Sequence, residues 1–502
     1  MKRMKKLIFI YTLLFLTGCS SFLEENVRGV IAPNNFYNSD QEAIQAANGL
    51  YLGMRTGNTY KGWQGITTWT MFGSDEMMPS RVFGGLAPIM DYNLTETNYS
   101  NAYGVWRDLY GVIGDANSVL ANVEGNEKLS VATQNTVIGE ALFLRALAYY
   151  HLTAIWGDVP YFVTELPLDE VAVLGRSPEG PIRQAMVEDL KRAEGLLPSA
   201  NQGANIGRAT KWAAKFLRTR FNLWQKDWAG ALEATEDIIQ NSPHKLLPTY
   251  GEVFDLNNQF NAEAIFGFDY TKDAPNNSQD ITDSFNPRLR DEPKVASQRN
   301  EFAAKLTALG EEFNGYGLNV PLNDLIDDFP KDDLRRPYNL LNNYLGYDLT
   351  FTYLTKRTNF DFVNSPRGNH GEAWITMRMG QVYLMAAEAA NELGKSAEAE
   401  TYINKIRARA YSPAKPYTGL SQTAMRKAIQ DENRWELAGE SERRYDLVRW
   451  GILVETVKNA NYGIFKGNVN IKPHMVKAPI PQQEIDLNPA LLDSDPTNNG
   501  YR

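Results

Sequence analysis

The stretch IQDENRWELAGESERRYDLVRWG, residues 429–451, combines helical periodicity with a high density of charged side chains. Glu432, Glu436 and Glu440 are four residues apart, so a helix would place their carboxylates on one face. Two such carboxylates could serve acid–base catalysis. Because arginines and apolar residues lie between them, we instead expect a network of ion pairs that holds a single helix, 420–450, against a helical scaffold.

Upstream of this stretch, the chain twice shows a pair of amphipathic helices joined by a tight turn. The periodicity predicts these pairs over residues 209–225 with 228–241, and 373–393 with 396–410. Alanines occupy inward positions, and small residues let antiparallel helices approach closely, as in tetratricopeptide repeats. We therefore predict a mostly α fold with an irregular scaffold of tetratricopeptide-type helix pairs. The predicted scaffold comprises residues 39–57, 104–244 and 372–452.

Two long regions, 57–104 and 245–371, lack this helical pattern. They are rich in Asn, Asp, Pro, Gly and aromatic residues, so we expect long insertions of irregular loops with little β structure. Loops of this length in a compact protein usually have a function, and we predict that both regions face a ligand. A polar, proline-rich tail over 453–502 completes a single predicted domain, 39–502.

The N-terminus predicts export and lipid anchoring. Basic residues precede an apolar run, residues 7–16, that is too short to span a bilayer as a helix. The sequence Leu-Thr-Gly-Cys follows, and it resembles a bacterial lipobox that ends in Cys19, the single cysteine of the chain. We therefore predict a signal peptide over 1–18, lipidation of Cys19 and a tether over 19–38. The alternative is an ordinary secretory signal with an incidental cysteine.

Composition and motifs argue against several classes of function. The net charge of the 502-residue chain is −9, whereas nucleic-acid-binding proteins neutralise phosphates with Lys and Arg. One cysteine and four scattered histidines show no metal-site spacing. The chain has no P-loop and no nucleophile elbow, and His370 lies in a loop without a partner motif, as surface histidines do. We therefore predict no catalytic residue, cofactor or metal site, although 60 Asp and Glu residues leave a two-carboxylate glycosidase open.

Aromatic residues outside helical periodicity form the predicted binding site. Sugar rings present apolar C–H faces to aromatic side chains, while Asp, Asn and Arg bind their hydroxyls. The alternative is that each aromatic side chain anchors its own loop to the scaffold. The predicted ligand-binding residues are Trp69, Asp75, Glu76, Arg81, Tyr92, Tyr99, Tyr344 and Tyr347.

The stretch 429–451 closely resembles the signature helix of the SusD/RagB family of nutrient-uptake lipoproteins. The matching positions are Glu432, Glu436, Leu437, Glu440, Arg443, Asp446, Leu447, Arg449, Trp450 and Gly451, whereas Asn433 and Ser441 depart from the usual arginine and glycine. The segments 145–150, 156–160 and 479–489 also match the family, so the resemblance covers nearly the whole chain.

This resemblance implies a SusD-like lipoprotein on the surface of the Gram-negative outer membrane. Such a protein caps a TonB-dependent, SusC-like transporter, binds an oligosaccharide and delivers it to the transporter by a lid-like motion, without catalysis or a cofactor. A peptide replaces the oligosaccharide in the RagB branch, so a peptide-binding uptake lipoprotein is the first alternative. A surface lipoprotein glycoside hydrolase is the second. The resemblance transfers no ligand-binding residue, because the family's ligand contacts are not part of a fixed motif.

Overall fold

A computed structural model describes residues 36–81, 86–272, 277–311, 315–360, 367–440, 442–462 and 469–502. The predicted signal peptide, Cys19 and most of the tether lie outside the described residues. Within the described ranges the chain is mostly α-helical, which confirms the predicted fold class, and its short strands form two-stranded antiparallel sheets. No helix in these ranges is long and apolar enough to cross a membrane.

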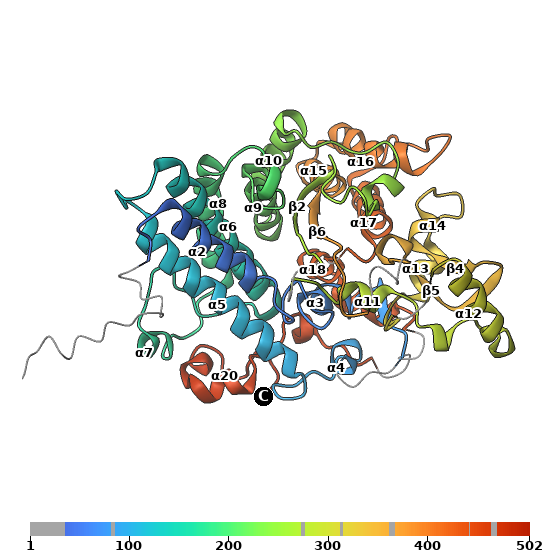
Figure 1. Cartoon of the computed structure of the whole chain (residues 1–502), viewed down its shortest axis with the longest axis horizontal. Coiled ribbons are helices and arrows are strands. Elements are labelled where there is room, and N and C mark those ends of the chain that lie inside the picture. Colours follow the sequence, from blue (N-terminus) through green and yellow to red (C-terminus); the bar gives the residue numbers. More distant parts are fainter. Residues whose placement is uncertain are drawn as a thin grey trace, which may run out of the picture.

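The long helices lie side by side and form an array along the left and upper parts of the molecule (Figure 1). Each helix packs on its neighbour in the chain: α5 on α6, α6 on α8, α8 on α9, α9 on α10, and α15 on α16. Contacts between α10 and α15 join the two predicted helix pairs. The helices of this array are α2 (Asp40–Gly53), α5 (Ser100–Val123), α6 (Val131–Trp156), α8 (Glu179–Leu196), α9 (Lys211–Gln225), α10 (Trp228–Asn241), α15 (Met379–Glu392), α16 (Ser396–Ala410) and α17 (Gln422–Leu437).

Local sequence sets the ends of these helices. The Ser39 hydroxyl accepts a hydrogen bond from the Glu42 amide at 3.4 Å, so it caps the N-terminus of α2. Lys226 ends α9 with a φ of 60°, and the Asp227 carboxylate accepts from the Gly230 amide at 3.0 Å to begin α10. The tight turn expected between the helices of this pair is confirmed.

The helix predicted over 373–393 is wrong at its beginning. Its first residues form strand β6 (Trp374–Arg378), which pairs antiparallel with β2 (Ala264–Phe268), and α15 begins only at Met379. All five residues of β2 are buried, so their backbone groups need partners that water does not supply. Strand β6 provides those partners. Residues 374–378 therefore form a strand through pairing with a distant segment, although their sequence pattern predicts a helix.

The single helix predicted over 420–450 is also wrong, because the structure contains two helices, α17 and α18 (Arg443–Arg449). Gly439 lies between them with a φ of +69°, which glycine adopts without steric cost. A Cβ atom on Gly439 would lie 2.4 Å from Leu354 Cδ2, so the close packing also requires glycine. Glu440 therefore lies beyond the helix that carries the other two glutamates.

The expected network of ion pairs is confirmed, and it is buried. Arg378 lies at its centre, with Nη1 2.7 Å from Glu436 Oε1 and 2.8 Å from Glu263 Oε1, and with Nε 2.5 Å from Glu440 Oε2. Five cations face five carboxylates, so the charges balance. We call these residues the buried ion-pair network: Arg335, Lys356, Arg378, Arg407 and Arg409 with Glu263, Asp333, Glu432, Glu436 and Glu440.

The regions predicted as loops fold into short elements with little β structure, as expected. The hairpin of β4 and β5 turns at Leu345 and Gly346, which both have positive φ. Strand β1 pairs with β3, which comes from a distant part of the chain. These elements are α3 (Ile66–Met71), β1 (Met77–Pro79), α4 (Ala87–Met90), α11 (Ile281–Phe285), α12 (Arg299–Ala308), β3 (Asn319–Pro321), α13 (Asn323–Asp328), α14 (Arg336–Asn339), β4 (Leu341–Tyr344) and β5 (Tyr347–Tyr353). The short helix α7 (Leu168–Val171) lies instead within the predicted scaffold.

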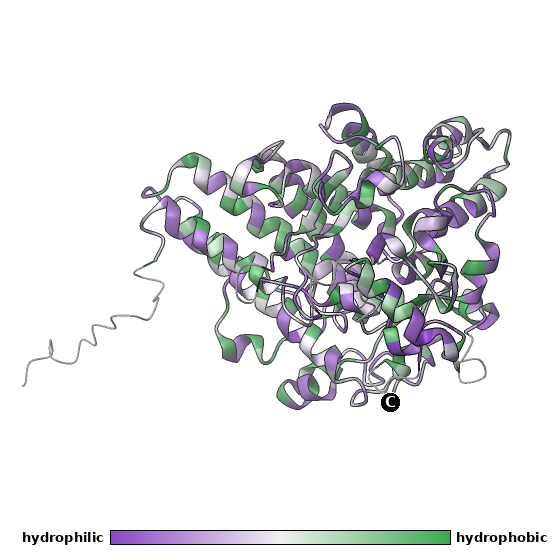
Figure 2. Cartoon of the chain, turned by 45° about the vertical axis from the view of Figure 1, so that its right-hand side comes forward, coloured by the Kyte–Doolittle hydropathy of each residue, from purple (hydrophilic) through white to green (hydrophobic). Residues whose placement is uncertain are grey.

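One apolar core joins the helical array to these short elements. The ring of Trp69, from α3, lies 6.1 Å from the ring of Trp156 at the end of α6. Apolar and polar residues are mixed along the helices (Figure 2). The helix α6 differs, because all of its residues from Val137 to Trp156 are buried. The core therefore fixes the short elements to the rigid array.

The C-terminal tail, which contains α19 (Leu453–Asn459) and α20 (Gln482–Leu487), folds back onto the array. Trp156 Nε1 donates to the carbonyl oxygen of Pro479 at 3.0 Å, and the Ala478 amide donates to the Ile155 carbonyl oxygen at 2.8 Å. The tail thereby satisfies polar groups at the C-terminal end of α6.

Candidate functional site

The structure buries four of the predicted ligand-binding aromatics. The exposed fraction is 1% for Trp69, 4% for Tyr92, 5% for Tyr99 and 7% for Tyr347. The Tyr92 hydroxyl donates to the Gly73 carbonyl oxygen, so this polar group is already satisfied inside the protein. We therefore correct the prediction for these four residues: their side chains are packed in the core and present no face to a ligand in this structure.

Asp75 and Glu76 are also inside the protein. Arg443 Nε lies 2.8 Å from one carboxylate oxygen of Asp75, and the Glu76 carboxylate accepts from the Gly439 amide. Burial favours a higher pKa for Asp75, but Arg443 outweighs it and lowers the pKa to about 2. Burial raises the pKa of Glu76 to about 7. Both side chains brace the break between α17 and α18, so the prediction that they bind a ligand is corrected as well.

Tyr344 and Arg81, by contrast, remain partly exposed. The Tyr344 ring stacks on Phe360, with ring centroids 5.2 Å apart and planes inclined by 18°. Arg81 Nη1 donates to the backbone carbonyl oxygen of Tyr316 at 2.9 Å. Arg81 therefore contacts a residue of a second pair of aromatic side chains, and the two members of this pair come from distant segments of the chain.

This pair consists of Trp63 and Tyr316, which are both partly exposed. Their ring centroids are 5.7 Å apart and their planes are inclined by 43°. The exposed guanidinium of Arg367 lies 4.1 Å from the centroid of the Tyr316 ring. We call Trp63 and Tyr316, with the adjoining Arg81, Arg367 and Asp280, the Trp63–Tyr316 platform.

The loop that carries Trp63 is held by close backbone packing. A Cβ atom on Gly62 would lie 2.0 Å from the Gly57 carbonyl oxygen, and one on Gly65 would lie 2.3 Å from the Thr59 carbonyl oxygen. Both positions therefore require glycine. The loop is fixed on its other side as well, because the Trp63 amide donates to Asp280 Oδ1 at 3.2 Å.

Tyr316 is positioned by the segment that leads into β3. Its amide donates to the carbonyl oxygen of Asp283 at 2.6 Å, and the Leu318 amide donates to that of Ser284 at 2.8 Å. These bonds run along α11, while β3 continues into its pairing with β1, the strand that precedes Arg81. The platform therefore combines segments that are more than 200 residues apart in the sequence.

The carboxylates beside the platform have protein partners. Burial raises the pKa of Asp280, and the Trp63 amide opposes this rise. Asp283 accepts from the Gly368 amide at 2.6 Å and lies 2.8 Å from His370 Nε2. His370 is therefore buried and paired, which corrects the expectation of a surface histidine. Burial disfavours its charged form, but the neighbouring carboxylates raise its pKa to about 9.

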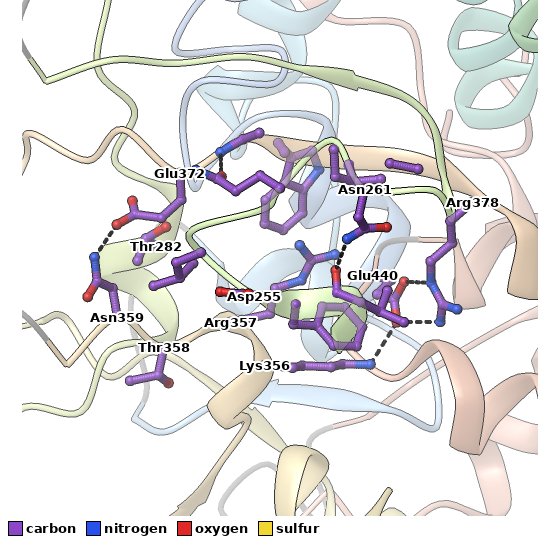
Figure 3. A pocket seen from close by; sticks show the side chains of 18 residues that line it. Asp255, Asn261, Thr282, Lys356, Arg357, Thr358, Asn359, Glu372, Arg378 and Glu440 are labelled. Carbon is purple, nitrogen blue, oxygen red and sulfur yellow. Dashed lines mark hydrogen bonds and ion pairs between the residues drawn. The ribbon is translucent and has the colours of Figure 1, made fainter. Parts of the chain in front are cut away.

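A narrow pocket lies between Arg357 and the buried ion-pair network (Figure 3). Its cavity volume is about 50 Å³, and about 10–15 Å³ on the same measure holds one water molecule. Lys356 Nζ lies 2.8 Å from Glu440 Oε1, and the Arg357 guanidinium lies 4.2 Å from the centroid of the Trp374 ring. The charged groups that this pocket shares with the buried ion-pair network already have protein partners, so the Trp63–Tyr316 platform is the better candidate site.

Two sequence profiles match the chain. One, the SusD family, matches residues 330–501, and the other, described as starch-binding and associating with the outer membrane, matches residues 69–223. SusD-like protein P25 of Formosa agariphila is 41% identical over the full length of both chains. The chain belongs to the SusD-like family. This membership confirms the resemblance that residues 429–451 indicated.

Solved structures of this superfamily share the fold of the SusD-like chain. A laminarin-binding SusD-like protein superposes with a TM-score of 0.74 at 24% identity, covering 90% of this chain and 98% of that one. Surface glycan-binding protein A of Bacteroides thetaiotaomicron, solved in complex with laminarihexaose, gives 0.71 at 19% identity, covering 92% and 100%. At these identities the likeness establishes the fold alone.

Most residues of the platform were not predicted from the sequence. Arg81 was the one predicted site residue in it, and neither Tyr316 nor Arg367 carries a local signal that sets it apart. Trp63 does carry one, because it lies in the segment Lys-Gly-Trp-Gln-Gly, residues 61–65, whose glycines and polar residues indicate an exposed turn.

Proposed function

We propose that this protein captures an oligosaccharide on the Trp63–Tyr316 platform at the outer-membrane surface and delivers it to a TonB-dependent, SusC-like transporter. The observation that carries the proposal is the pair of partly exposed rings, 5.7 Å apart, held on a rigid base. Membership of the SusD-like family supports the same function. The laminarin-binding and laminarihexaose-bound relatives support a glycan as the ligand.

The surroundings of the platform suit a sugar chain. Two inclined rings offer apolar surfaces to the C–H faces of successive sugar units. Polar side chains adjoin Trp63: Asn101 Nδ2 donates to Gln64 Oε1 at 3.0 Å, and both side chains are partly exposed. Amides of this kind exchange hydrogen bonds with hydroxyls, because they both donate and accept.

We propose binding without cleavage. Glycosidases need two carboxylates, about 5–9.5 Å apart, that can exchange protons with the substrate. Next to the platform, Asp280 accepts from the Trp63 amide and Asp283 is paired with His370. These bonds favour a structural role for both groups. Chromatography of glycans after incubation with the protein should show unchanged chain lengths; shortened products that disappear in an Asp280→Asn variant would support the hydrolase alternative.

The proposed anchor is a lipid on Cys19. The Cys19→Ala variant should be lost from the outer membrane or should accumulate unprocessed, as measured by fractionation and by incorporation of labelled lipid. Unchanged membrane retention, with no label on the wild-type protein, would contradict lipid anchoring.

The proposed site is tested by binding. Full-length protein in mild detergent is first screened on a glycan array and a peptide panel, and its strongest glycan is then titrated against Trp63→Ala. A matched control is Trp228→Ala, because Trp228 is also partly buried but begins α10 in the helical array. We expect Trp63→Ala to weaken binding about tenfold or more and the control to leave it unchanged. Equal affinities of the two variants would contradict the site, and capture of peptides alone would support the RagB-like alternative.

A further inference from the structure

Four arginines lie in the Trp63–Tyr316 platform or next to it, and Asp291 pairs with two of them. The Gly315 amide donates to the Pro287 carbonyl oxygen at 3.0 Å, which places the segment 287–291 next to Tyr316. The arginines are Arg81, Arg288, Arg290 and Arg367, and the acidic residue is Asp291.

Asp291 pairs loosely with the two arginines of its own segment. It lies 3.6 Å from Arg288 Nη1 and 3.8 Å from Arg290 Nε, and the Arg290 side chain is 72% exposed. Within the part of the chain that the structure describes, neither Arg81 nor Arg367 has a carboxylate at ion-pair distance. Even with Asp280 counted beside Asp291, four arginines meet two carboxylates, so the cluster carries a local excess of positive charge.

This excess is unusual for the chain as a whole. The net charge is −9, and in the buried ion-pair network every cation has a carboxylate partner. Burial lowers the pKa of Arg81; Arg290 and Arg367 lower it as well, and Asp291 opposes them. Positive groups that repel one another at a binding surface favour a negatively charged ligand.

We infer that the glycan bound by the platform is anionic, and that Arg81 and Arg367 bind its sulfate or carboxylate groups while the aromatic rings hold the sugar. This inference rests on the proposed function. Guanidinium groups present paired N–H donors that match the oxygens of such anions, and these charge-assisted hydrogen bonds are stronger than neutral ones. Both arginines contact Tyr316, one at its carbonyl oxygen and one over its ring, so they lie next to the aromatic pair that holds the sugar in the proposed function.

The test compares charged and neutral polysaccharides. Full-length protein is titrated with dextran sulfate, polygalacturonate and uncharged dextran, at low and at high salt. At least one of the two anionic probes should bind at least tenfold more tightly than dextran. Its affinity should fall as salt rises, because ions screen exposed charges.

Variants separate this site from general attraction to polyanions. Arg81→Ala/Arg367→Ala should lose at least tenfold in affinity for the anionic probe. The control Arg192→Ala/Arg426→Ala removes two exposed arginines from the helical array and should change the affinity less than twofold. Arg367→Ala alone should show part of the loss, and it keeps the test valid if the double variant unfolds.

The outcomes distinguish this inference from the proposed function. Equal binding of charged and neutral probes, no binding of either anionic probe, or equal losses in the two double variants would overturn the anionic ligand. If Trp63→Ala abolishes binding of a neutral glycan while the arginine variants retain it, the platform stands and the inference fails. If the arginine variants lose the anionic probe while Trp63→Ala retains it, the arginines bind the anion and the aromatic platform fails.

Discussion

Two groups of basic residues in this molecule differ in their surroundings. In the buried ion-pair network, Arg378 is fully enclosed and contacts three glutamates. Beside the platform, Arg367 is exposed, lies over the Tyr316 ring and has no carboxylate partner among the described residues. A buried cation without a partner is strongly unfavourable, whereas water solvates an exposed one. Burial and pairing, rather than residue type, therefore separate arginines that hold the fold from arginines available to a ligand.

The largest expected difference between the two groups is in stability. Arg378→Ala removes one cationic partner from each of three buried glutamates, so we expect a loss of about 3–5 kcal/mol in the free energy of unfolding. Arg367→Ala should lose less than about 1 kcal/mol, because its side chain is exposed. Urea denaturation of both variants measures these values. Similar losses in the two variants would contradict the distinction.

A buried and a partly exposed tryptophan allow the same comparison of stability. Trp69→Ala removes a fully buried side chain and should lower the free energy of unfolding by about 3–5 kcal/mol. Trp63→Ala should lower it by clearly less, because its ring is partly exposed. Thermal and urea unfolding test this order. A Trp63→Ala variant as unstable as Trp69→Ala would assign Trp63 to the core.

Acid should weaken the buried network in a defined range of pH. Burial acts to raise the pKa of Glu440, but Arg378 and Lys356 outweigh it and hold the pKa at about 2, below the ordinary value of 4.5. A carboxylate with a lowered pKa contributes stability that is complete above about pH 4.5 and is lost as the pH falls toward 2. The difference corresponds to about 3 kcal/mol.

The Glu440→Gln variant isolates this contribution. Its unfolding free energy should fall less steeply than that of the wild type between pH 5 and pH 3, since glutamine does not titrate. Urea denaturation at several pH values gives both slopes. Parallel slopes would show that Glu440 does not contribute to the acid sensitivity.

The smallest loss of stability is expected for an exposed ion pair. Arg426 Nε lies 2.7 Å from Glu392 Oε1, but the arginine side chain is 40% exposed. Arg426→Ala should therefore cost less than about 1 kcal/mol. A loss as large as that of Arg378→Ala would mean that pairing alone, without burial, determines the stabilisation.

The sequence predicts the helices of the array well, but it does not predict strand β6 or the break between α17 and α18. The helices expected over 228–241 and 396–410 are present with those boundaries as α10 and α16, because a helix depends mainly on local periodicity and caps. Strand β6 and the break at Gly439 depend instead on distant partners, β2 and Leu354. No local pattern contains those partners.

The candidate site likewise depends on contacts between distant segments of the chain. Trp69 belongs to the buried helix α3, in which three of the six residues are threonines, and Trp63 lies between glycines and polar residues. Local polarity alone therefore does not separate the buried ring from the partly exposed one. The sequence does not predict that Tyr316 and Arg367 meet Trp63, because three distant segments assemble the platform through backbone hydrogen bonds and packing.

The most direct test of the central claim is a crystal structure of the protein with its highest-affinity glycan. We predict a sugar ring in van der Waals contact, at about 4 Å, with the ring of Trp63 or Tyr316. A glycan bound in the pocket beside Arg357 and Trp374, or on the helical array, with the platform unoccupied, would contradict the claim.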